Sequence, residues 1–314
     1  MTLPNEIILD RFLSEIKYVS GIEVAGAYTP LDAVDSKYKS IRFHQFPLYR
    51  TYASLLEDVD AVYINAPLKL RDNLIEEALV QGKHVLTEFP FSLNYQKAKE
   101  FVKVASEKSL VLMEGLKTAY CPAFGKMISL VKSGRIGKIL SIEANFTQIL
   151  GDDLPNQVRI AGGSVASLGA YPLLVVFKLL GYNYKNIEFI THQENGIDTM
   201  TRMNFVYDGA IATSLVAINA KAEGALTISG TKGYVYVPAP WWKTEYYELR
   251  YEDINNNSKF FYKFEGEGLR YEIIEFIKRI KDNNMMAGSL TCMDMLAESK
   301  VIDCFMKDKY NVPF

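Results

Sequence analysis

The side chains best suited to metal and thiol chemistry are few in this sequence. There are three cysteines, an odd number, with no Cys-x-x-Cys spacing, which argues against both a disulfide framework and a zinc site. The three histidines are isolated from one another and show no metal-ligand spacing. These residues are Cys121, Cys292, Cys304, His44, His84 and His192. We therefore expect no bound metal, and the chemistry open to the chain is that of hydroxyl, amine and carboxyl groups.

Alternating helices and strands in the first third predict a parallel sheet covered on both faces. Helical periodicity occurs at about 6–19, 71–80 and 94–109, and apolar strand patterns occur at 22–28, 59–64, 84–86 and 110–113. Repeated β-α-β units with right-handed crossovers favour a doubly wound, Rossmann-like sheet. Ligands of such sheets bind outside the carboxyl ends of the strands. We assign residues 1–119 to this domain.

The pattern changes after about residue 120. We expect a helix at 123–133, a strand at 139–147 and a buried helix at 165–180 that Gly181 ends. From 187 to 264 the chain reads as successive strands with turn signals and no convincing helix between them, which favours an antiparallel sheet. The predicted strands lie at 187–190, 201–206, 211–217, 226–228, 234–237 and 246–251. Two helices, at 269–280 and 291–306, close the chain. Residues 120–314 are therefore predicted to form an α+β domain with a large, mainly antiparallel sheet.

Composition narrows the class of partner. The chain has 314 residues, 49% of them hydrophobic, and a net charge of -2, so nothing favours nucleic acid or an anionic membrane surface. No apolar run is long enough to span a membrane, and the first residues do not have the pattern of a signal peptide. We expect a cytoplasmic protein that binds a small molecule or other copies of itself.

Several strings together resemble the Gfo/Idh/MocA oxidoreductases. The strings are GKHVLTEFP at 82–90, CPAF at 121–124, SGRIG at 133–137, GGSVASLGAYP at 162–172 and GTKGY at 230–234. They occur in order and with sensible spacing, and a set of strings is far more specific than one motif. The resemblance implies NAD or NADP as the cofactor, a sugar, nucleotide sugar or polyol as the substrate, and a homodimer or larger assembly formed through the sheet of the second domain.

The resemblance also assigns roles to residues. Members of the family use a lysine between the Glu and Pro of the first string, and here that position is Phe89, which can neither donate a proton nor carry charge. Tyr171 matches the catalytic tyrosine or histidine, although it also fits a tyrosine packed in the core. Ser167 stands where many members have Asp. Lys117, just past a strand end, is a candidate replacement for the lysine or an ordinary solvated lysine.

Cofactor contacts are implied at the ends of the strands. The resemblance places Ala66, Pro67, Glu88 and Pro90 in the loops near nicotinamide and ribose. Thr29, with Lys37 or Lys39, would favour the 2′-phosphate of NADP. The choice between NAD and NADP stays open.

The start of the dinucleotide site is missing from the sequence. Pro4 and Glu6 stand where the loop glycines would be, so an N–H group is lost and a negative charge is added beside the pyrophosphate. Without the first strand, its neighbours would lie about 9 to 10 Å apart with unpaired backbone. We expect either that Met1 is not the natural start or that the sheet has rearranged.

Two hypotheses follow. The first is an NAD(P)-dependent oxidoreductase with an impaired site, and the second is a degenerate relative that binds a sugar or a partner subunit without redox chemistry. Two aromatic pairs, Trp241-Trp242 and Tyr246-Tyr247, fit a sugar-stacking platform or a dimer surface, and we favour the dimer surface.

Overall fold

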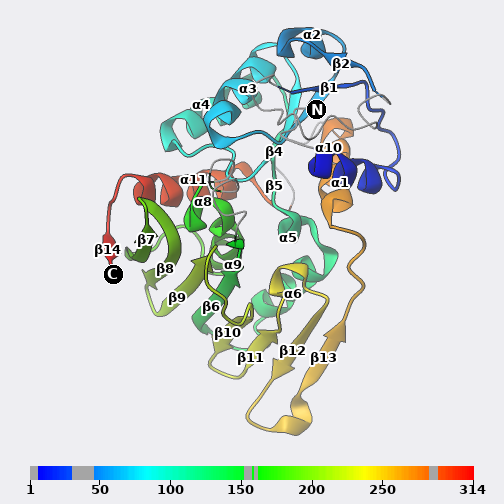
Figure 1. Ribbon diagram of the computed structural model, residues 1–314. Helices are drawn as coiled ribbons and strands as arrows, with labels where there is room; N and C mark the ends of the chain where they lie inside the picture. The colour runs from blue at the N-terminus through cyan, green and yellow to red at the C-terminus, as the bar shows by residue number, and fades with distance from the viewer. Residues whose placement is uncertain (1–5, 30–45, 152–157, 159–161, 283–288) are drawn as a thin grey trace. The chain divides into compact units, whose positions relative to one another are not determined.

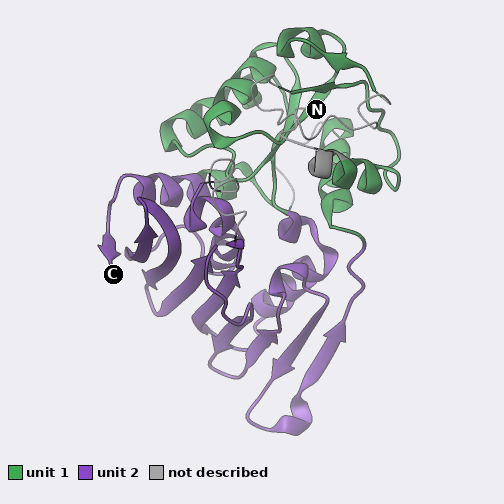
Figure 2. Ribbon diagram, in the orientation of Figure 1, with its two compact units in different colours: residues 1–116, 266–296 green, residues 117–265, 297–314 purple. Residues whose placement is uncertain are grey.

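The computed structural model describes residues 6–29, 46–151, 158, 162–282 and 289–314. These residues divide into two compact units (Figure 2). Unit 1 contains 1–116 and 266–296, and unit 2 contains 117–265 and 297–314. The predicted boundary at 119/120 lies close to the first division, but the sequence did not predict that 266–296 belong to unit 1.

Unit 1 is a small Rossmann-like domain (Figure 1). Its elements are α1 (Glu6–Ile16), β1 (Ala27–Tyr28), β2 (Leu48–Tyr49), α2 (Tyr52–Glu57), β3 (Ala61–Ile64), α3 (Leu68–Val80), β4 (His84–Glu88), α4 (Tyr95–Glu107), β5 (Leu112–Gly115) and α10 (Leu269–Lys281). Strands β3, β4 and β5 form one parallel sheet, and β1 and β2 form a separate parallel pair. The doubly wound sheet is therefore incomplete, as the sequence predicts.

The predicted strand at 22–28 is shorter in the structure. Only Ala27 and Tyr28 pair with a neighbour, in β2, while Ile22 remains 36% exposed. A strand is defined by its ladder, so residues without a neighbouring strand to pair with are not part of one.

In unit 1, capping side chains and a left-handed glycine mark where helices begin and end. The Asn94 side chain accepts hydrogen bonds from the backbone N–H groups of Gln96 and Lys97 at 2.9 and 3.1 Å, which caps α4. Gly82, with φ of 73°, lies in the left-handed region directly after α3 and before β4. Helix α10 packs on α1 and β5, because its apolar face, which includes Ile273 and Phe276, is covered there.

Unit 2 is built on a large mixed sheet. Its strand order is β13-β12-β11-β10-β6-β9-β8-β7-β14 among the described residues. The strands are β6 (Ile139–Thr147), β7 (Asn186–Glu194), β8 (Ile197–Tyr207), β9 (Ala210–Ala217), β10 (Leu226–Gly230), β11 (Tyr234–Val237), β12 (Tyr246–Arg250), β13 (Ser258–Phe261) and β14 (Asn311–Pro313). Most neighbours are antiparallel, as predicted, but β6–β9 and β14–β7 are parallel. The sequence did not predict β13 or β14.

Unit 2 also contains several helices, and one predicted helix is two helices that meet at a glycine. The helical elements are α5 (Lys117–Tyr120), α6 (Pro122–Lys132), α8 (Ser164–Leu168), α9 (Ala170–Leu180) and the short η5 (Trp241–Lys243) and η6 (Ile254–Asn256). The single predicted helix at 165–180 is two helices that meet at Gly169, where an added Cβ would lie 2.5 Å from the Val165 carbonyl oxygen. Helix α11 (Cys292–Met306) contains the third and last division between the units, after Leu296. None of the described helices has the length and apolar character that a membrane crossing requires.

Candidate functional site

The strand ends of unit 1 are held by one buried arginine. Arg71 of α3 is only 4% exposed, and its guanidinium donates hydrogen bonds to four backbone carbonyl oxygens. Three belong to Glu88, Phe89 and Pro90, at 3.3, 2.9 and 2.7 Å, and the fourth belongs to Ala66, at 2.9 Å. Arg71 therefore joins the loop after β3 to the loop after β4.

The Arg71 charge is buried in an acidic setting. Burial lowers the pKa of Arg71, and the negative charges of Glu88 and Glu114 act in the opposite direction. Glu114 of β5 also accepts a hydrogen bond from the Phe91 backbone N–H at 2.8 Å, which fixes the same loop from the other side. The backbone at Phe89 is thus held firmly, whatever side chain stands there.

Glu88 is engaged within unit 1. The Tyr63 hydroxyl donates a short hydrogen bond to the Glu88 carboxylate, and the Asn65 amide lies 3.3 Å from the same hydroxyl. Burial raises the pKa of Tyr63 well above its ordinary value, and the charges of Glu88 and Glu272 add to this effect. Tyr63 therefore stays a neutral donor at physiological pH.

Four of the five predicted cofactor residues lie together. Ala66 and Pro67 follow β3, and Glu88 and Pro90 lie at the end of β4 and just after it, around the Arg71 guanidinium. Thr29 follows β1, in the separate pair of strands, and among the described residues it makes no hydrogen bond to the other four. Lys37 and Lys39 lie outside the described residues.

The described residues fit only part of a dinucleotide. The loops after β3 and β4 present an ordered edge for a nicotinamide and its ribose. A pyrophosphate needs backbone N–H groups on a glycine turn before a helix, and the first glycine in the sequence, Gly21, follows α1. Gly26 offers no such cradle, because a Cβ placed there would lie 2.5 Å from the Tyr49 ring.

In unit 2, Tyr171 belongs to an aromatic cluster. It stands at the start of α9, half-buried, and its ring lies 4.8 Å from the Phe146 ring in an edge-on arrangement. The Phe146 ring is stacked on Trp242 with 3.7 Å between the centroids. We call Phe146, Tyr171 and Trp242 the aromatic cluster. A half-buried phenol beside flat apolar rings can receive a polar ring and donate a hydrogen bond to it.

Lys117 begins the short helix beside this cluster. The hydroxyl of the next residue, Thr118, donates a hydrogen bond to the Trp242 carbonyl oxygen at 2.6 Å, which holds α5 against η5. The Lys117 side chain is half-buried and makes no hydrogen bond or ion pair within the part of the chain that the structure describes. Both predicted catalytic residues thus lie in unit 2, with Trp242 between their elements.

Asp198, which the sequence analysis did not single out, fixes the helix that precedes Tyr171. Its carboxylate accepts hydrogen bonds from the Val165 N–H and the Ser164 hydroxyl, both at 2.8 Å, at the start of α8. Burial raises the pKa of Asp198, and these hydrogen bonds oppose that rise. The Gly162-Gly163 pair was the available signal, because a Cβ on Gly163 would lie 1.8 Å from an Asp198 oxygen. Ser167 donates to the Gly162 carbonyl oxygen at 3.1 Å.

The expectation of a dimer surface at both aromatic pairs is wrong for two of the four residues. Trp241 and Tyr247 are 0% and 1% exposed within unit 2, and the Trp241 indole N–H donates to the Asn145 carbonyl oxygen at 2.9 Å. They are core residues and present no surface to a partner. Trp242, in contrast, belongs to the aromatic cluster.

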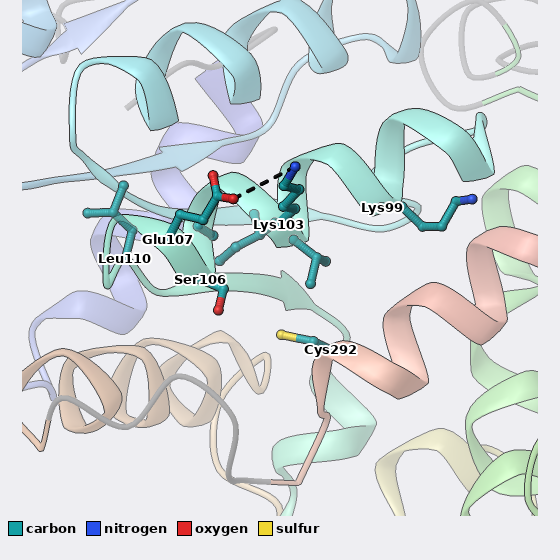
Figure 3. Close-up of a pocket in the computed structure, with 9 residues that line it drawn as sticks. Lys99, Lys103, Ser106, Glu107, Leu110 and Cys292 are labelled. Carbon is teal, nitrogen blue, oxygen red and sulfur yellow. Dashed lines mark ion pairs between the residues drawn. The ribbon is translucent and has the colours of Figure 1, made fainter.

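A second candidate, a cavity of unit 1, does not carry catalysis. Figure 3 shows Cys292 at the start of α11 facing Ser106 of α4, with Lys103 paired to Glu107 at 3.8 Å. Burial raises the pKa of Cys292, so its thiol is protonated and weakly nucleophilic at neutral pH. Among the described residues no group of His, Cys, Asp and Glu side chains could hold a metal ion.

Comparisons with known proteins agree with this architecture. A family model described as an oxidoreductase family with an NAD-binding Rossmann fold matches residues 11–116, and the GFO/IDH/MocA C-terminal domain matches 124–236. KijD10, a 3-ketoreductase from Actinomadura kijaniata solved with NADP and TDP-benzene, superposes with a TM-score of 0.83 at 22% identity, over 100% of this chain and 98% of that one.

Curated relatives align over shorter lengths. A dTDP-3,4-didehydro-2,6-dideoxy-α-D-glucose 3-reductase of Actinomadura kijaniata is 30% identical over 59% of this chain and 55% of its own length. A trans-1,2-dihydrobenzene-1,2-diol dehydrogenase of Sus scrofa is 28% identical over 64% of this chain and 62% of its own. The chain thus spans just over half the length of these relatives. With both domain models matched in order, the chain belongs to the Gfo/Idh/MocA family of oxidoreductases.

Proposed function

We propose that this chain is an NAD(P)-dependent oxidoreductase that acts on a sugar or a nucleotide sugar and uses Tyr171 as its proton donor. The observation that carries the proposal is the aromatic cluster, in which the Phe146 ring contacts the Tyr171 ring edge-on and stacks on Trp242. Sugar rings present apolar faces that pack well on such side chains, while their hydroxyl groups need fixed polar partners. The 3-reductase and 3-ketoreductase among the relatives support a sugar substrate.

The proton step belongs to Tyr171. A nicotinamide cofactor supplies or accepts the hydride when it is bound. A carbonyl that becomes a hydroxyl also needs a proton, and the phenol can donate one at the oxygen it touches. Asp198 positions Tyr171 by capping α8, the helix directly before α9.

In unit 1, the family's lysine position is occupied by Phe89. The backbone there is held by Arg71 in an ordered loop, but the side chain has no group that can hold a substrate hydroxyl. Proton transfer by a positioned side chain contributes on the order of 100- to 10,000-fold, so the chain should turn over slowly. Lys117 is our candidate to replace the positive charge of the family's lysine, because the Thr118 hydrogen bond holds α5 beside Trp242 of the aromatic cluster.

The test is NADH or NADPH oxidation by the purified protein. The substrate is the dTDP-linked keto sugar in the relative's name, with free keto sugars as comparison. We expect slow turnover that Tyr171→Phe reduces at least tenfold. Tyr182→Phe is the matched control, because Tyr182 lies just after the same helix and its ring contacts Phe177 edge-on, away from the aromatic cluster. Equal rates in the wild type and Tyr171→Phe would refute the role of Tyr171.

The second candidate is a sugar-binding protein without redox chemistry. Phe89 and the misfit of the pyrophosphate half favour it. Calorimetry separates the two: binding of the nucleotide sugar that Trp242→Ala abolishes, with no oxidation of either cofactor, would establish the second candidate and overturn the first.

A further inference from the structure

The segment between β9 and β10 in unit 2 is fixed to the end of β6. The Thr147 hydroxyl donates to the Ala222 carbonyl oxygen at 3.1 Å and accepts from the Ala222 N–H at 2.8 Å. The Lys221 ammonium donates a hydrogen bond to the Thr147 carbonyl oxygen at 3.3 Å. Lys221 is an exposed residue, but these contacts hold both its backbone neighbour and its ammonium group at the end of β6.

This segment touches the aromatic cluster at two points. Thr147, which receives the Lys221 ammonium, is the residue directly after Phe146 in β6. Farther along the segment, a Cβ added at Gly224 would lie 2.9 Å from the Trp242 ring, so the backbone passes close to that ring. The positive charge of Lys221 therefore lies at the edge of the aromatic cluster.

The other lysines around the cluster are placed differently. The Lys243 ammonium lies over the Phe264 ring, 5.7 Å from its centre. Lys117 is half-buried at the start of α5. Lys221 is exposed, makes no ion pair with any residue that the structure describes, and uses one of its three N–H donors on Thr147. Two donors and a positive charge are thus available to a ligand at the edge of the cluster.

We propose that Lys221 binds the diphosphate of a nucleotide-linked sugar whose ring packs on the aromatic cluster. The inference rests on the proposed function and narrows its substrate to the nucleotide-linked class. In such a molecule the diphosphate is attached directly to the sugar ring. A ring in contact with Phe146 or Trp242 therefore places an anion at the edge of the cluster, where the Lys221 ammonium is held. A lysine ammonium binds phosphate as a point charge.

The type of cation favours a diphosphate over a carboxylate or a neutral sugar. A neutral sugar gains little from a full charge beside its ring. A carboxylate is matched best by the planar fork of an arginine, whereas a diphosphate offers several charged oxygens to a single ammonium group. Glu223 is exposed two residues after Lys221 and forms no ion pair with it in the described part of unit 2, so no carboxylate neutralises the ammonium at contact distance there.

Calorimetry of the whole protein with dTDP, the nucleotide part of a dTDP-linked sugar, tests the inference. Lys221→Met should weaken dTDP binding about tenfold or more, because a charge-assisted hydrogen bond is lost. Lys221→Arg should keep the affinity within about threefold of the wild type, because the positive charge remains. Lys232→Met is the matched control and should bind as the wild type does, because Lys232 is an exposed lysine in the turn after the other end of β10. Added salt should weaken binding less in Lys221→Met than in the wild type.

Two results would overturn the role of Lys221: no binding of dTDP to the wild type, or equal affinities of the wild type and Lys221→Met. D-glucuronate, a sugar that has a carboxylate and no phosphate, is the second probe. Glucuronate binding that depends on Lys221, with dTDP binding that does not, would replace the diphosphate with a sugar acid.

The same titrations separate this inference from the proposed function. Binding of dTDP that depends on Lys221, without oxidation of either cofactor, would leave the diphosphate site in place and remove the oxidoreductase. Turnover that Tyr171→Phe reduces, with dTDP binding that Lys221→Met leaves unchanged, would keep the oxidoreductase and remove the diphosphate site.

Discussion

At the scale of residues, Arg71 decides the geometry around Phe89. A single buried guanidinium donates hydrogen bonds to four carbonyl oxygens in two loops, so it holds these loops together at the strand ends. The family position at Phe89 has lost its amine, yet the loop that would present it keeps an ordered backbone. A lysine introduced at 89 would therefore enter a loop that is already built.

Replacing Arg71 with leucine should lower the free energy of unfolding by about 3 kcal/mol, because buried carbonyl oxygens would lose their donors. Arg135→Leu is the control: Arg135 is exposed, and the change should stay within about 0.5 kcal/mol. Urea denaturation of both variants measures the difference. Equal stability of the two variants would show that Arg71 does not hold the loops.

Residue types alone revealed part of the site. The sequence identified Phe89, Tyr171 and the strand-end residues because their strings are local. It did not reveal the partners of Tyr171, because Phe146 and Trp242 come from distant elements that only the folded sheet brings together. The role of Arg71 was also not predicted, because its four acceptors depend on the pairing of β3 with β4.

At the scale of elements, a buried ion pair between Glu15 and Arg270 joins α1 to the first turn of α10. The Arg270 guanidinium lies 2.9 Å from the Glu15 carboxylate, which also accepts from the backbone N–H groups of Glu267 and Arg270. Burial alone would raise the pKa of Glu15, but the hydrogen bonds from Arg270 and from the two backbone N–H groups, with the charge of Arg270, lower it overall.

Because the pKa of Glu15 is lowered by folding, its ionised form stabilises the fold above the ordinary carboxyl pKa of 4.5, and this stabilisation is lost as the pH falls through the lowered value. Glu15→Gln should cost about 3 kcal/mol at pH 7, and the gap to the wild type should narrow below pH 4.5.

The control for that variant is Glu267→Gln, which breaks only the exposed pair with Arg11 and should change stability by less than about 1 kcal/mol. Denaturation from pH 7 to pH 3 gives both curves. A gap between Glu15→Gln and the wild type that stays constant over this range would contradict the ionic role of Glu15.

Element types were predicted well where periodicity was long. The helices at α3, α4, α6, α10 and α11 and the strands β6 to β12 lie where the sequence predicts them. The exceptions are local: residues 22–26 form no ladder in the described part of unit 1, and two helices meet at Gly169, whose N–H donates to the Val165 carbonyl oxygen. Strand β14 is three residues long and pairs in parallel with β7, a long-range contact that no local pattern encodes.

At the scale of the whole molecule, the chain matches both domain models of its family, and the described residues of the first domain form two parallel sheets. The mixed sheet of unit 2 is continuous among the described residues, whereas the two sheets of unit 1 are separate. The sequence analysis expected a gap in the first sheet, because the usual first strand and glycine turn are not in the sequence. It did not predict that β1 and β2 would form a pair of their own.

The most direct test of the account is the rate of NAD(P)H oxidation after Phe89→Lys, with Phe89→Met as a matched control that has similar length and no charge. We predict that lysine raises kcat by about 100-fold or more over the wild type, because it restores the amine with which the family holds the substrate hydroxyl and assists proton transfer, and that methionine does not. A lysine variant no faster than the methionine variant would contradict the claim that Phe89 limits this oxidoreductase.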